Sequence, residues 1–237
     1  MNNSSGHISH KEQVLALYHQ QSVEELFDDY AETFDEHLQK GLRYNVPTLL
    51  YEAWRKHVPS CEDATETTTK VVQRCLDLGC GTGLAGQVFR NDCSYLQGVD
   101  LSRGMCQQAK RKQLYDKVVH ESLLSHVRKQ REASFDLILS ADVFMYVLDL
   151  KAVIEQVSRI MSPQGWFVFS TESLEAEHPD NVCRQASERF AHKRDFVLNI
   201  AQATQSLELV SVDGVTLRMD DGKPVMGDIF VFQKCCP

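Results

Sequence analysis

The sequence predicts an α/β protein with a seven-stranded, mostly parallel sheet, a C-terminal antiparallel hairpin and a helical N-terminal extension. From Val71 onward, short apolar segments alternate with longer amphipathic ones, which is the pattern of βαβ units in a sheet covered on both faces. Two strand-like segments, 207–219 and 227–234, flank the turn signal "DDGKP" near the C-terminus. We expect these two segments to close the sheet as an antiparallel hairpin.

The extension is expected to begin with a flexible segment, residues 1–21, followed by a helix that starts at Ser22. Ser22 and Glu25 have the spacing of a capping box, in which each side chain bonds a free amide of the first helical turn. Apolar residues follow at helical spacing as far as Leu38. Gly41 is expected to end the helix or to lie just past its end.

A second helix is expected over residues 47–58, because Pro47 suits the first turn of a helix. The two helices together form an N-terminal cap, residues 22–60. The polar, aperiodic segment 61–70 is expected to be a surface linker to the rest of the chain.

Residues 71–237 are expected to form the core of the protein, with an insertion on the substrate side at about 173–200. Helices are expected from Leu84, from Ser102 and over 150–161. The expected strands outside the hairpin are 71–78, 95–100, 117–120, 135–141 and 166–172.

Composition narrows the classes of function. The net charge of -8 makes nucleic acid a less favoured partner, because an acidic chain repels phosphate backbones. The longest apolar run, 135–150, contains three aspartates and is too polar to cross a bilayer. The first residues lack the pattern of a secretory signal, so a cytoplasmic location is expected.

The cysteines do not have the spacing of a metal site. None of the eight forms a C-x-x-C pair, so we expect no metal and no disulfide framework, only reduced thiols. They stand at positions 61, 75, 80, 93, 106, 183, 235 and 236.

A glycine-rich turn, "GCGTG", follows the first expected core strand. Glycines at 79, 81 and 83 leave the backbone bare where a nucleotide-like ligand can approach closely. Leu84 stands where the dinucleotide fingerprint G-x-G-x-x-G requires its third glycine, and no P-loop is present. Asp100 ends the next strand and can accept hydrogen bonds from both ribose hydroxyls of an adenosine. The alternative for Asp100 is a helix cap, although Ser102 is the better cap for the helix that follows.

"LDLGCGTG" followed by "GVDLS" resembles motifs I and II of class I S-adenosylmethionine-dependent methyltransferases, which have a Rossmann-like fold. The strong resemblance covers about residues 71–172. More narrowly, "FDDYAETFDEHL", "SADVFMYV", "RFAHKRDFV" and "VTLRMDDGKPVMGDIFVF" resemble a group of bacterial methyltransferases known as TPR-associated. No TPR array is visible in the sequence, so the resemblance implies a catalytic domain alone.

The resemblance implies a role for each residue of the turn and of the strand ends. The cofactor's methionine moiety would lie against the turn. Asp77 would organise the turn and reach the ammonium group of that moiety directly or through water. Asp100 would hold the ribose and Leu101 and Met105 would flank the adenine. The turn residues concerned are Gly79, Cys80, Gly81 and Gly83.

Three further parts of the chain are implied to reach the cofactor. Glu121 stands where the family usually has an Asp that contacts the adenine amino group. Tyr30 and Phe34 would close over the cofactor from the N-terminal helix, unless they serve core packing instead. The end of the fourth strand, Ser140, Ala141 and Asp142, would lie beside the sulfonium and the methyl acceptor.

Methyl transfer needs alignment and exclusion of water rather than a nucleophilic side chain, and a base only where the acceptor must lose a proton. His37 and His192 are candidate bases, with a surface or packing role as the alternative. A basic cluster, with a plain solvated helix face as its alternative, would receive an anionic substrate. It comprises Arg184, Arg189, Lys193 and Arg194. Within the same segment, Glu188 stands where the narrower group usually has a glycine.

The leading hypothesis is a methyltransferase that uses S-adenosyl-L-methionine on a small-molecule or protein acceptor. A catalytically degenerate cofactor-binding module acting through a partner protein is the alternative, and the glycine spacing disfavours a nicotinamide-dependent oxidoreductase. If Asp100 holds the ribose, Asp100→Ala is expected to weaken cofactor binding while leaving the melting temperature of the free protein nearly unchanged.

Overall fold

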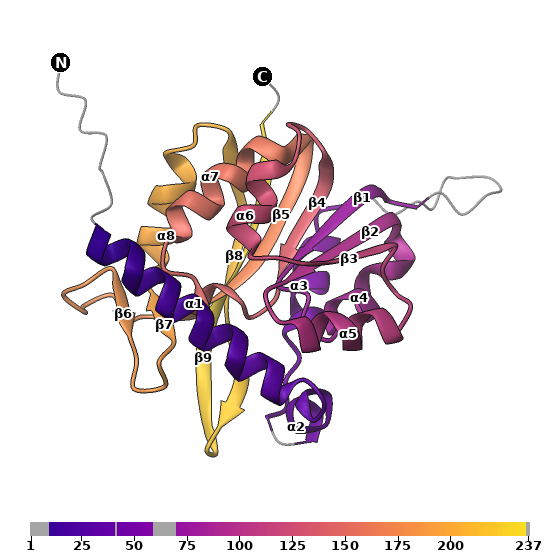
Figure 1. Ribbon diagram of the computed structural model, residues 1–237. Coiled ribbons are helices and arrows are strands. Elements are labelled where there is room, and N and C mark those ends of the chain that lie inside the picture. The colour runs from indigo at the N-terminus through magenta and orange to yellow at the C-terminus, as the bar shows by residue number, and fades with distance from the viewer. Residues whose placement is uncertain (1–9, 41, 59–69, 236–237) are drawn as a thin grey trace.

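The computed structural model describes residues 10–40, 42–58 and 70–235, and its centre is one mixed sheet with helices on both faces (Figure 1). The strand order along the main path is β3-β2-β1-β4-β5-β7-β6, and β9 pairs with β5 and with β8. The strands are β1 (Val72–Leu78), β2 (Cys93–Asp100), β3 (Lys117–His120), β4 (Phe135–Ser140), β5 (Met161–Ser173), β6 (Val182–Arg184), β7 (Phe190–His192), β8 (Leu207–Asp220) and β9 (Lys223–Lys234).

The parallel part of the sheet and the C-terminal hairpin confirm the predicted fold class. β1 to β5 pair in parallel in the order 3-2-1-4-5, and β9 adds to β5 antiparallel with β8 outside it. The short strands β6 and β7 were not predicted; β7 pairs in parallel with the end of β5, and β6 pairs antiparallel with β7. Both lie within the expected insertion, 173–200.

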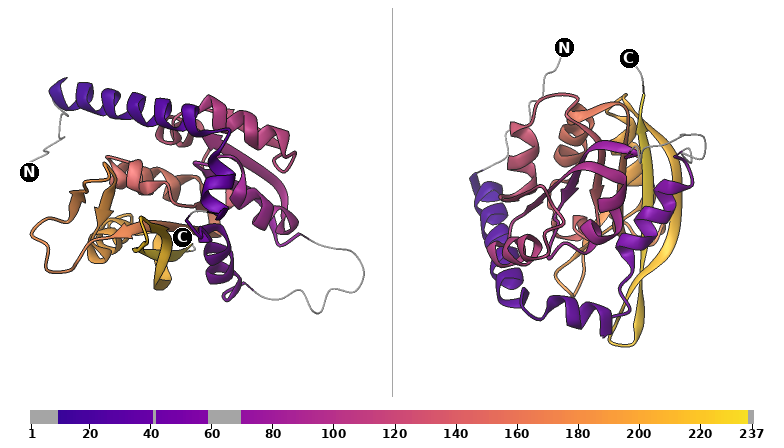
Figure 2. Two further views of the ribbon diagram at one scale, coloured as in Figure 1. Left: turned by 90° about the horizontal axis from the view of Figure 1, so that it is seen from below. Right: turned by 90° about the vertical axis from the view of Figure 1, so that its right-hand side faces the viewer.

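Alternation along each strand divides the core between the two faces, because successive strand residues point to opposite sides. In β5, Phe167 and Phe169 pack into the cluster that holds α6 (Leu123–Lys129), α7 (Leu150–Ile160) and α8 (Arg194–Gln202). Val168, between them, packs into the other cluster with α3 (Val46–Arg55) and α4 (Leu84–Phe89). The result is a helix–sheet–helix sandwich, seen from two further sides in Figure 2.

The N-terminal helix starts earlier and ends earlier than the sequence predicts. α1 (His10–Tyr30) already runs through Ser22, whose hydroxyl donates to the carbonyl of Tyr18 in place of a capping box. A separate helix, α2 (Phe34–Lys40), follows after a turn. Tertiary bonds explain the break, because Asp28 and Asp35 are held by different parts of the core.

These bonds join the two N-terminal helices to the helix after β2, α5 (Arg103–Arg111). Asp28 accepts from the Ser102 hydroxyl at 2.5 Å and from the Gly104 amide at 2.8 Å. Asp35 accepts from Lys112 at 2.5 Å, and from the Thr82 hydroxyl. α1 therefore lies across the edge of the sheet at the carboxyl ends of its strands (Figure 1).

The predicted starts of the second cap helix and of two core helices are confirmed. Pro47 stands in the first turn of α3, and α4 begins at Leu84. Ser102 caps α5 by accepting from the Met105 amide at 3.0 Å, as expected of it. Two single-turn 3₁₀ segments, Arg90–Asp92 and Phe144–Tyr146, complete the described elements.

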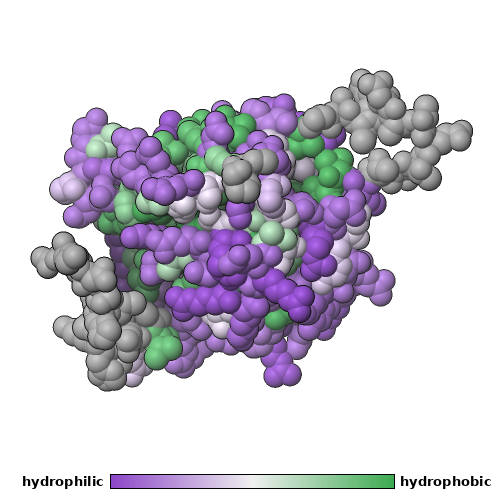
Figure 3. All heavy atoms as spheres, turned by 90° about the horizontal axis from the view of Figure 1, so that it is seen from above, coloured by the Kyte–Doolittle hydropathy of each residue, from purple (hydrophilic) through white to green (hydrophobic). Residues whose placement is uncertain are grey.

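Three other expectations from the sequence concern the linker, the first residues of the chain and the membrane. The predicted linker lies almost wholly outside the described residues, as do residues 1–9 of the segment expected to be flexible. No helix in the described ranges is long and apolar enough to cross a membrane. On the face shown in Figure 3, hydrophilic side chains prevail and hydrophobic ones form small groups.

Candidate active site

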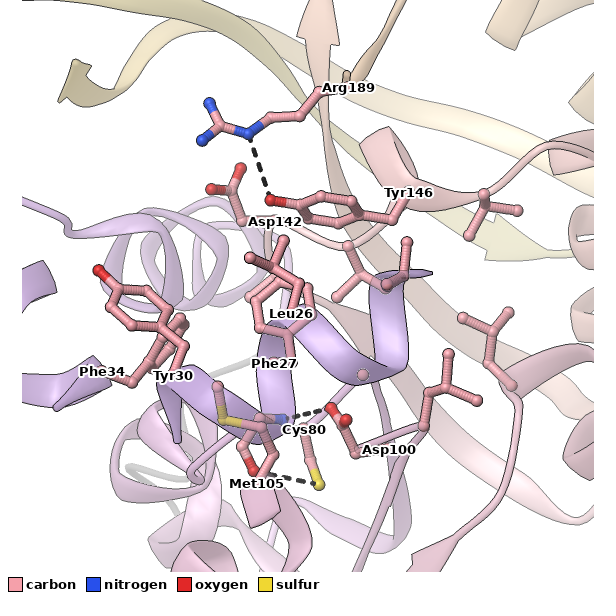
Figure 4. A pocket seen from close by; sticks show the side chains of 18 of the residues that line it. Leu26, Phe27, Tyr30, Phe34, Cys80, Asp100, Met105, Asp142, Tyr146 and Arg189 are labelled. Carbon is pink, nitrogen blue, oxygen red and sulfur yellow. Dashed lines mark hydrogen bonds between the residues drawn. The ribbon is translucent and has the colours of Figure 1, made fainter. Parts of the chain in front are cut away.

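A cavity of about 500 Å³ opens where the strand order reverses, between β1 and β4. In open parallel sheets, ligands bind at this point, beyond the carboxyl ends of the strands. Residues just past β1, at the end of β2 and past β4 line one side of the cavity, and α1 and α2 line the other. Figure 4 shows its two ends, with Asp100, Cys80 and Met105 at one and Asp142, Tyr146 and Arg189 at the other.

The glycine turn forms the floor of the cavity. The amides of Gly79 and Cys80 both donate to the carbonyl of Val99, at 2.8 and 3.0 Å, which fixes the turn against β2. Gly79 has a φ of +73°, and a Cβ on it would lie 2.4 Å from a methyl of Val143. Gly81 has a φ of +51°, and a Cβ there would meet no atom within 4 Å. The turn therefore needs glycine at 79 for packing, whereas at 81 a Cβ would occupy open space.

Asp100 stands at the end of β2 beside this turn. Its Oδ2 accepts from the Gly81 amide and its Oδ1 from the Ser102 amide, both at 2.8 Å. Burial raises the pKa of Asp100, while these two backbone bonds act in the opposite direction. The carboxylate is thus held rigidly at the cavity wall, and each oxygen keeps lone-pair capacity for a ligand donor.

Asp77 lies behind the turn and does not line the cavity. It is buried, with Oδ2 accepting from the Tyr115 hydroxyl at 2.6 Å and Oδ1 without a partner among the described residues. Burial raises its pKa to about 7, against the effect of the bond from Tyr115. This position agrees with the role expected of Asp77 in organising the turn. Because Asp77 does not line the cavity, its expected contact with an ammonium group stays a prediction.

Leu101 and Met105 line the cavity near Asp100, and their expected contact with an adenine stays a prediction. Glu121 does not, which corrects its expected contact with an adenine. Its carboxylate is engaged by Ser125, His126 and Lys129, and the bond from Lys129 holds the pKa of Glu121 down at about 2. The residues that follow it, Ser122, Leu123 and Leu124, line the cavity instead.

The N-terminal helices supply an aromatic wall. Tyr30 and Phe34 line the cavity, with ring centroids 5.3 Å apart and edge-to-face. Phe27 packs edge-to-face on Tyr146 at 5.2 Å, so α1 contacts the loop after β4 directly. His37 also lines the cavity, and its ring is hydrogen-bonded to the Tyr30 hydroxyl.

The far end of the cavity holds a charged cluster that the sequence only partly predicts. Arg218, buried in β8, donates to Asp142 Oδ2 at 2.6 Å and to Glu172. Arg189 donates to the Tyr146 hydroxyl at 3.2 Å and to Asp220 at 3.1 Å. We call these residues the acceptor-end cluster: Asp142, Tyr146, Glu172, Arg189, Arg218 and Asp220.

Asp142 is the residue of this cluster whose hydrogen bonding is incomplete. Its Oδ1 is buried and has no hydrogen-bond partner among the described residues. Burial raises its pKa to about 6 against the opposing charge of Arg218. Its φ is +60°, and its amide donates to the Ser170 hydroxyl at 2.9 Å, which holds the residue in this conformation.

Several predicted residues lie away from the cavity. His192 is buried against Phe196, its Nδ1 lacks a partner among the described residues, and burial lowers its pKa to about 4. It is therefore no base for this site. Ser140 is also buried and donates to the Leu78 carbonyl at 2.9 Å.

Of the predicted basic cluster, only Arg189 lines the cavity. Arg184 pairs with Glu188 on the surface, and Arg194 pairs with Asp228. Lys193 precedes the first residue of α8. The cluster is thus divided among separate ion pairs and does not form one anion site.

Among the described residues, no group of His, Cys, Asp and Glu could hold a metal ion. The described cysteines are free thiols, of which Cys75, Cys80, Cys93 and Cys106 are buried. Burial raises the pKa of the Cys80 thiol well above its usual range. Cys80 therefore lines the cavity as a neutral, apolar contact.

Comparison with known families matches residues 76–169 to the methyltransferase domain family. The malonyl-[acyl-carrier protein] O-methyltransferase of Serratia marcescens is 30% identical over 101 residues, which cover 42% of this chain and 38% of that protein. The ubiquinone biosynthesis O-methyltransferase of Paracidovorax citrulli is 27% identical over 109 residues, covering 44% and 46%. The chain thus spans less than half the length of these relatives.

Among solved structures, the 1,6-didemethyltoxoflavin-N1-methyltransferase of Burkholderia thailandensis, with 1,6-didemethyltoxoflavin and S-adenosylhomocysteine bound, is similar with a TM-score of 0.66. The likeness covers 98% of this chain and 93% of that one at 13% identity. An S-adenosylmethionine-dependent methyltransferase of Mesorhizobium loti has a TM-score of 0.58 at 20% identity, covering 78% and 97%. Both likenesses are of fold, and they agree with the Rossmann-like arrangement of the sheet.

Proposed function

We propose that this chain, whose residues 76–169 form a methyltransferase domain with S-adenosylmethionine as cofactor, transfers a methyl group to a small-molecule acceptor. The observation that carries the proposal is the single cavity that joins the Asp100 carboxylate to the acceptor-end cluster. Its volume of about 500 Å³ lies in the range of small-molecule sites, and α1 covers one side of it. A site covered in this way favours a small acceptor over a folded protein.

The residues present fit the cofactor. Gly81 leaves open space at the floor of the cavity where a side chain would stand, and Asp100 offers carboxylate oxygens to ribose hydroxyls. Leu101 and Met105 supply apolar contacts for the adenine, and Tyr30 and Phe34 supply aromatic faces that favour a cationic sulfur. When bound, S-adenosylmethionine supplies an activated methyl group.

The protein's own contribution is alignment and exclusion of water. The glycine turn is fixed to β2 by two backbone bonds, so the floor is preorganised. The apolar side chains of α1 that line the cavity, among them Val23 and Phe27, keep water away from the reacting atoms. No nucleophilic side chain is needed for this reaction.

The alternative of a degenerate binding module has no observation in its favour. The turn and Asp100 of the cofactor half and the aspartate and arginines of the acceptor half all line the same cavity. The narrower resemblance to the TPR-associated group and the cytoplasmic location stay predictions. The O-methyltransferase relatives cover 42% and 44% of this chain, so their acceptors are not transferred to it.

The test is thermal unfolding of the protein alone and with S-adenosylmethionine, S-adenosylhomocysteine or NAD. A ligand at about a hundred times its Kd adds roughly 2.7 kcal/mol, which raises the melting temperature by about 5–10 °C for a chain of this size. We expect that rise with both S-adenosyl compounds and none with NAD. Cooperative melting without a rise from either S-adenosyl compound would contradict the proposal.

A further inference from the structure

Asp142 has a largely buried carboxylate with incomplete hydrogen bonding, although buried polar groups normally have hydrogen-bond partners. Its side chain is 13% exposed, Oδ2 is bonded to Arg218, and Oδ1 has no partner among the described residues. A buried carboxylate oxygen that is left unpaired loses its hydration without gaining a hydrogen bond, which is unfavourable. Because Asp142 lines the cavity, a ligand that brings a hydrogen-bond donor removes this cost.

The charges around Asp142 do not balance. Three carboxylates, Asp142, Glu172 and Asp220, face two guanidiniums, Arg189 and Arg218. Besides the bonds described above, Arg189 lies 3.8 Å from the Glu172 carboxylate. Glu172 and Arg218 are 8% and 4% exposed, so water screens them little, whereas Asp220 is 46% exposed and water screens its charge more. The cluster therefore carries a surplus of one negative charge when its carboxylates are ionised.

The walls next to this cluster are aromatic. Phe27, Tyr30 and Tyr146 line the cavity together with Tyr44. Aromatic faces bind the apolar body of a small molecule and attract a cationic group. An amine attached to an apolar body is complementary to this wall and to the surplus charge at once.

We propose that the acceptor is a small amine with an apolar body, whose nitrogen donates a hydrogen bond to the Asp142 carboxylate. This inference rests on the proposed methyl transfer and names its substrate class. Arg218 acts as a positioning residue, because its bond to Oδ2 fixes the carboxylate and leaves Oδ1 for the amine.

The chemistry of transfer to nitrogen agrees with a carboxylate at this place. An ammonium first gives one proton to Asp142. The nitrogen lone pair then forms the N–C bond to the methyl group as the C–S bond breaks and its electron pair goes to sulfur. The positive charge thus passes from sulfur to nitrogen, beside the Asp142 carboxyl, and the pKa of about 6 lets this group hold and release the proton near neutral pH.

A carboxylate acceptor would meet the opposite situation. It would bring a second negative charge to a cluster that already has a surplus, and like charges this close disfavour binding. An alcohol would satisfy Oδ1 but would leave the surplus charge uncompensated. The cluster therefore discriminates among three molecules of the same shape that differ only in this group.

The test uses benzylamine, benzyl alcohol and benzoate as probes on protein saturated with S-adenosylhomocysteine, with affinities measured by ligand-observed NMR. We expect benzylamine to bind at least about tenfold more tightly than either of the others. Asp142→Asn places an amide donor where Oδ1 accepted, and an asparagine tolerates the φ of +60° at this residue. In this variant, we expect the affinity for benzylamine to fall by about tenfold or more, the usual effect of losing a bond to a charged group.

Asp221→Asn is the matched control. Asp221 is exposed, stands in the β8–β9 turn and also has a positive φ, +46°, so the substitution is the same in chemistry and in backbone. We expect it to bind benzylamine as the wild type does. Both variants are expected to bind S-adenosylhomocysteine within about threefold of the wild type.

Each other outcome is informative. Equal binding of the three probes, or of none, overturns the inference, as does an Asp142→Asn variant that binds benzylamine like the wild type. Loss of S-adenosylhomocysteine binding in that variant would assign Asp142 to the cofactor and also overturn it. Wild-type protein that does not bind S-adenosylhomocysteine contradicts the proposed function itself. If Asp142→Asn does not fold, the comparison of the three probes on the wild type decides alone.

Discussion

Replacing Asp100 by alanine tests the cofactor half of the site. The carboxylate accepts two backbone hydrogen bonds, from Gly81 and Ser102, both at 2.8 Å. It therefore joins the glycine turn to the start of α5 even without a ligand. This geometry does not support the sequence-based expectation that Asp100→Ala leaves the melting temperature nearly unchanged.

The size of the effect follows from these bonds. Hydrogen bonds to a charged group contribute roughly 1.5–3 kcal/mol each, and the burial that raises the pKa of Asp100 offsets part of this. We expect a net loss of about 2 kcal/mol of unfolding free energy, or about 4–8 °C in melting temperature for this chain length. Two ribose hydroxyls that donate to the carboxylate contribute roughly 3 kcal/mol, so the Kd for S-adenosylhomocysteine is expected to rise about a hundredfold.

Isothermal titration calorimetry with S-adenosylhomocysteine measures the Kd, and calorimetric melting of the free protein measures the stability. Asp116→Ala is the matched control, because Asp116 accepts from the Leu96 amide at 2.7 Å and pairs with Arg90 away from the cavity. It is expected to lose comparable stability and to keep its affinity. A Kd for Asp100→Ala within threefold of the wild-type value would refute the placement of the ribose at this residue.

Further predictions concern the turn and the buried histidine. Gly79→Ala puts a Cβ 2.4 Å from Val143 at a φ of +73°, so denaturant unfolding should show a loss on the order of 3 kcal/mol or more. Gly81→Ala meets no atom within 4 Å and should lose only about 1 kcal/mol, while its affinity for S-adenosylhomocysteine falls at least about tenfold. His192 has its pKa lowered to about 4, so it adds stability above the unfolded value of 6.5 that is lost as the pH falls towards 4. In His192→Phe, the loss of unfolding free energy between pH 7 and pH 4 should be smaller by roughly 3 kcal/mol, and methyl transfer should be retained. A variant as sensitive to acid as the wild type would contradict this.

The sequence could predict those parts of the fold whose signals are local. Each strand of the parallel sheet is a short apolar segment next to a turn signal, and the hairpin is marked by its own turn. The break between α1 and α2 has no such signal, because Asp28 and Asp35 are anchored by residues distant in sequence. β6 and β7 are three residues each, too short for a local signal; β7 pairs with the end of β5, which is distant in sequence, and β6 pairs with β7.

The same difference between local signals and contacts distant in sequence applies to the site. The glycine turn and Asp100 could be found because a tight turn and a strand end confine their residues to a few positions. Arg218 could not, since its partners, Asp142 in the loop after β4 and Glu172 on β5, are distant in sequence and nothing in "VTLRMD" marks a buried arginine. The expectation for Glu121 failed for the opposite reason, because nearby residues determine its contacts. It stands at the expected position of the motif, but His126 and Lys129 on α6 are close enough in sequence to engage its carboxylate.

One residue links the cofactor half of the site to the helix that covers it. The Ser102 amide donates to Asp100, and the Ser102 hydroxyl donates to Asp28 on α1. A ligand that contacts both Asp100 and the α1 side chains of the cavity, such as Tyr30, makes the second set of contacts only when α1 is docked. By linkage, docking of α1 must then raise the affinity for that ligand by the same factor by which the ligand favours docking. Weakening the Asp28 anchor would therefore lower cofactor affinity although Asp28 does not line the cavity.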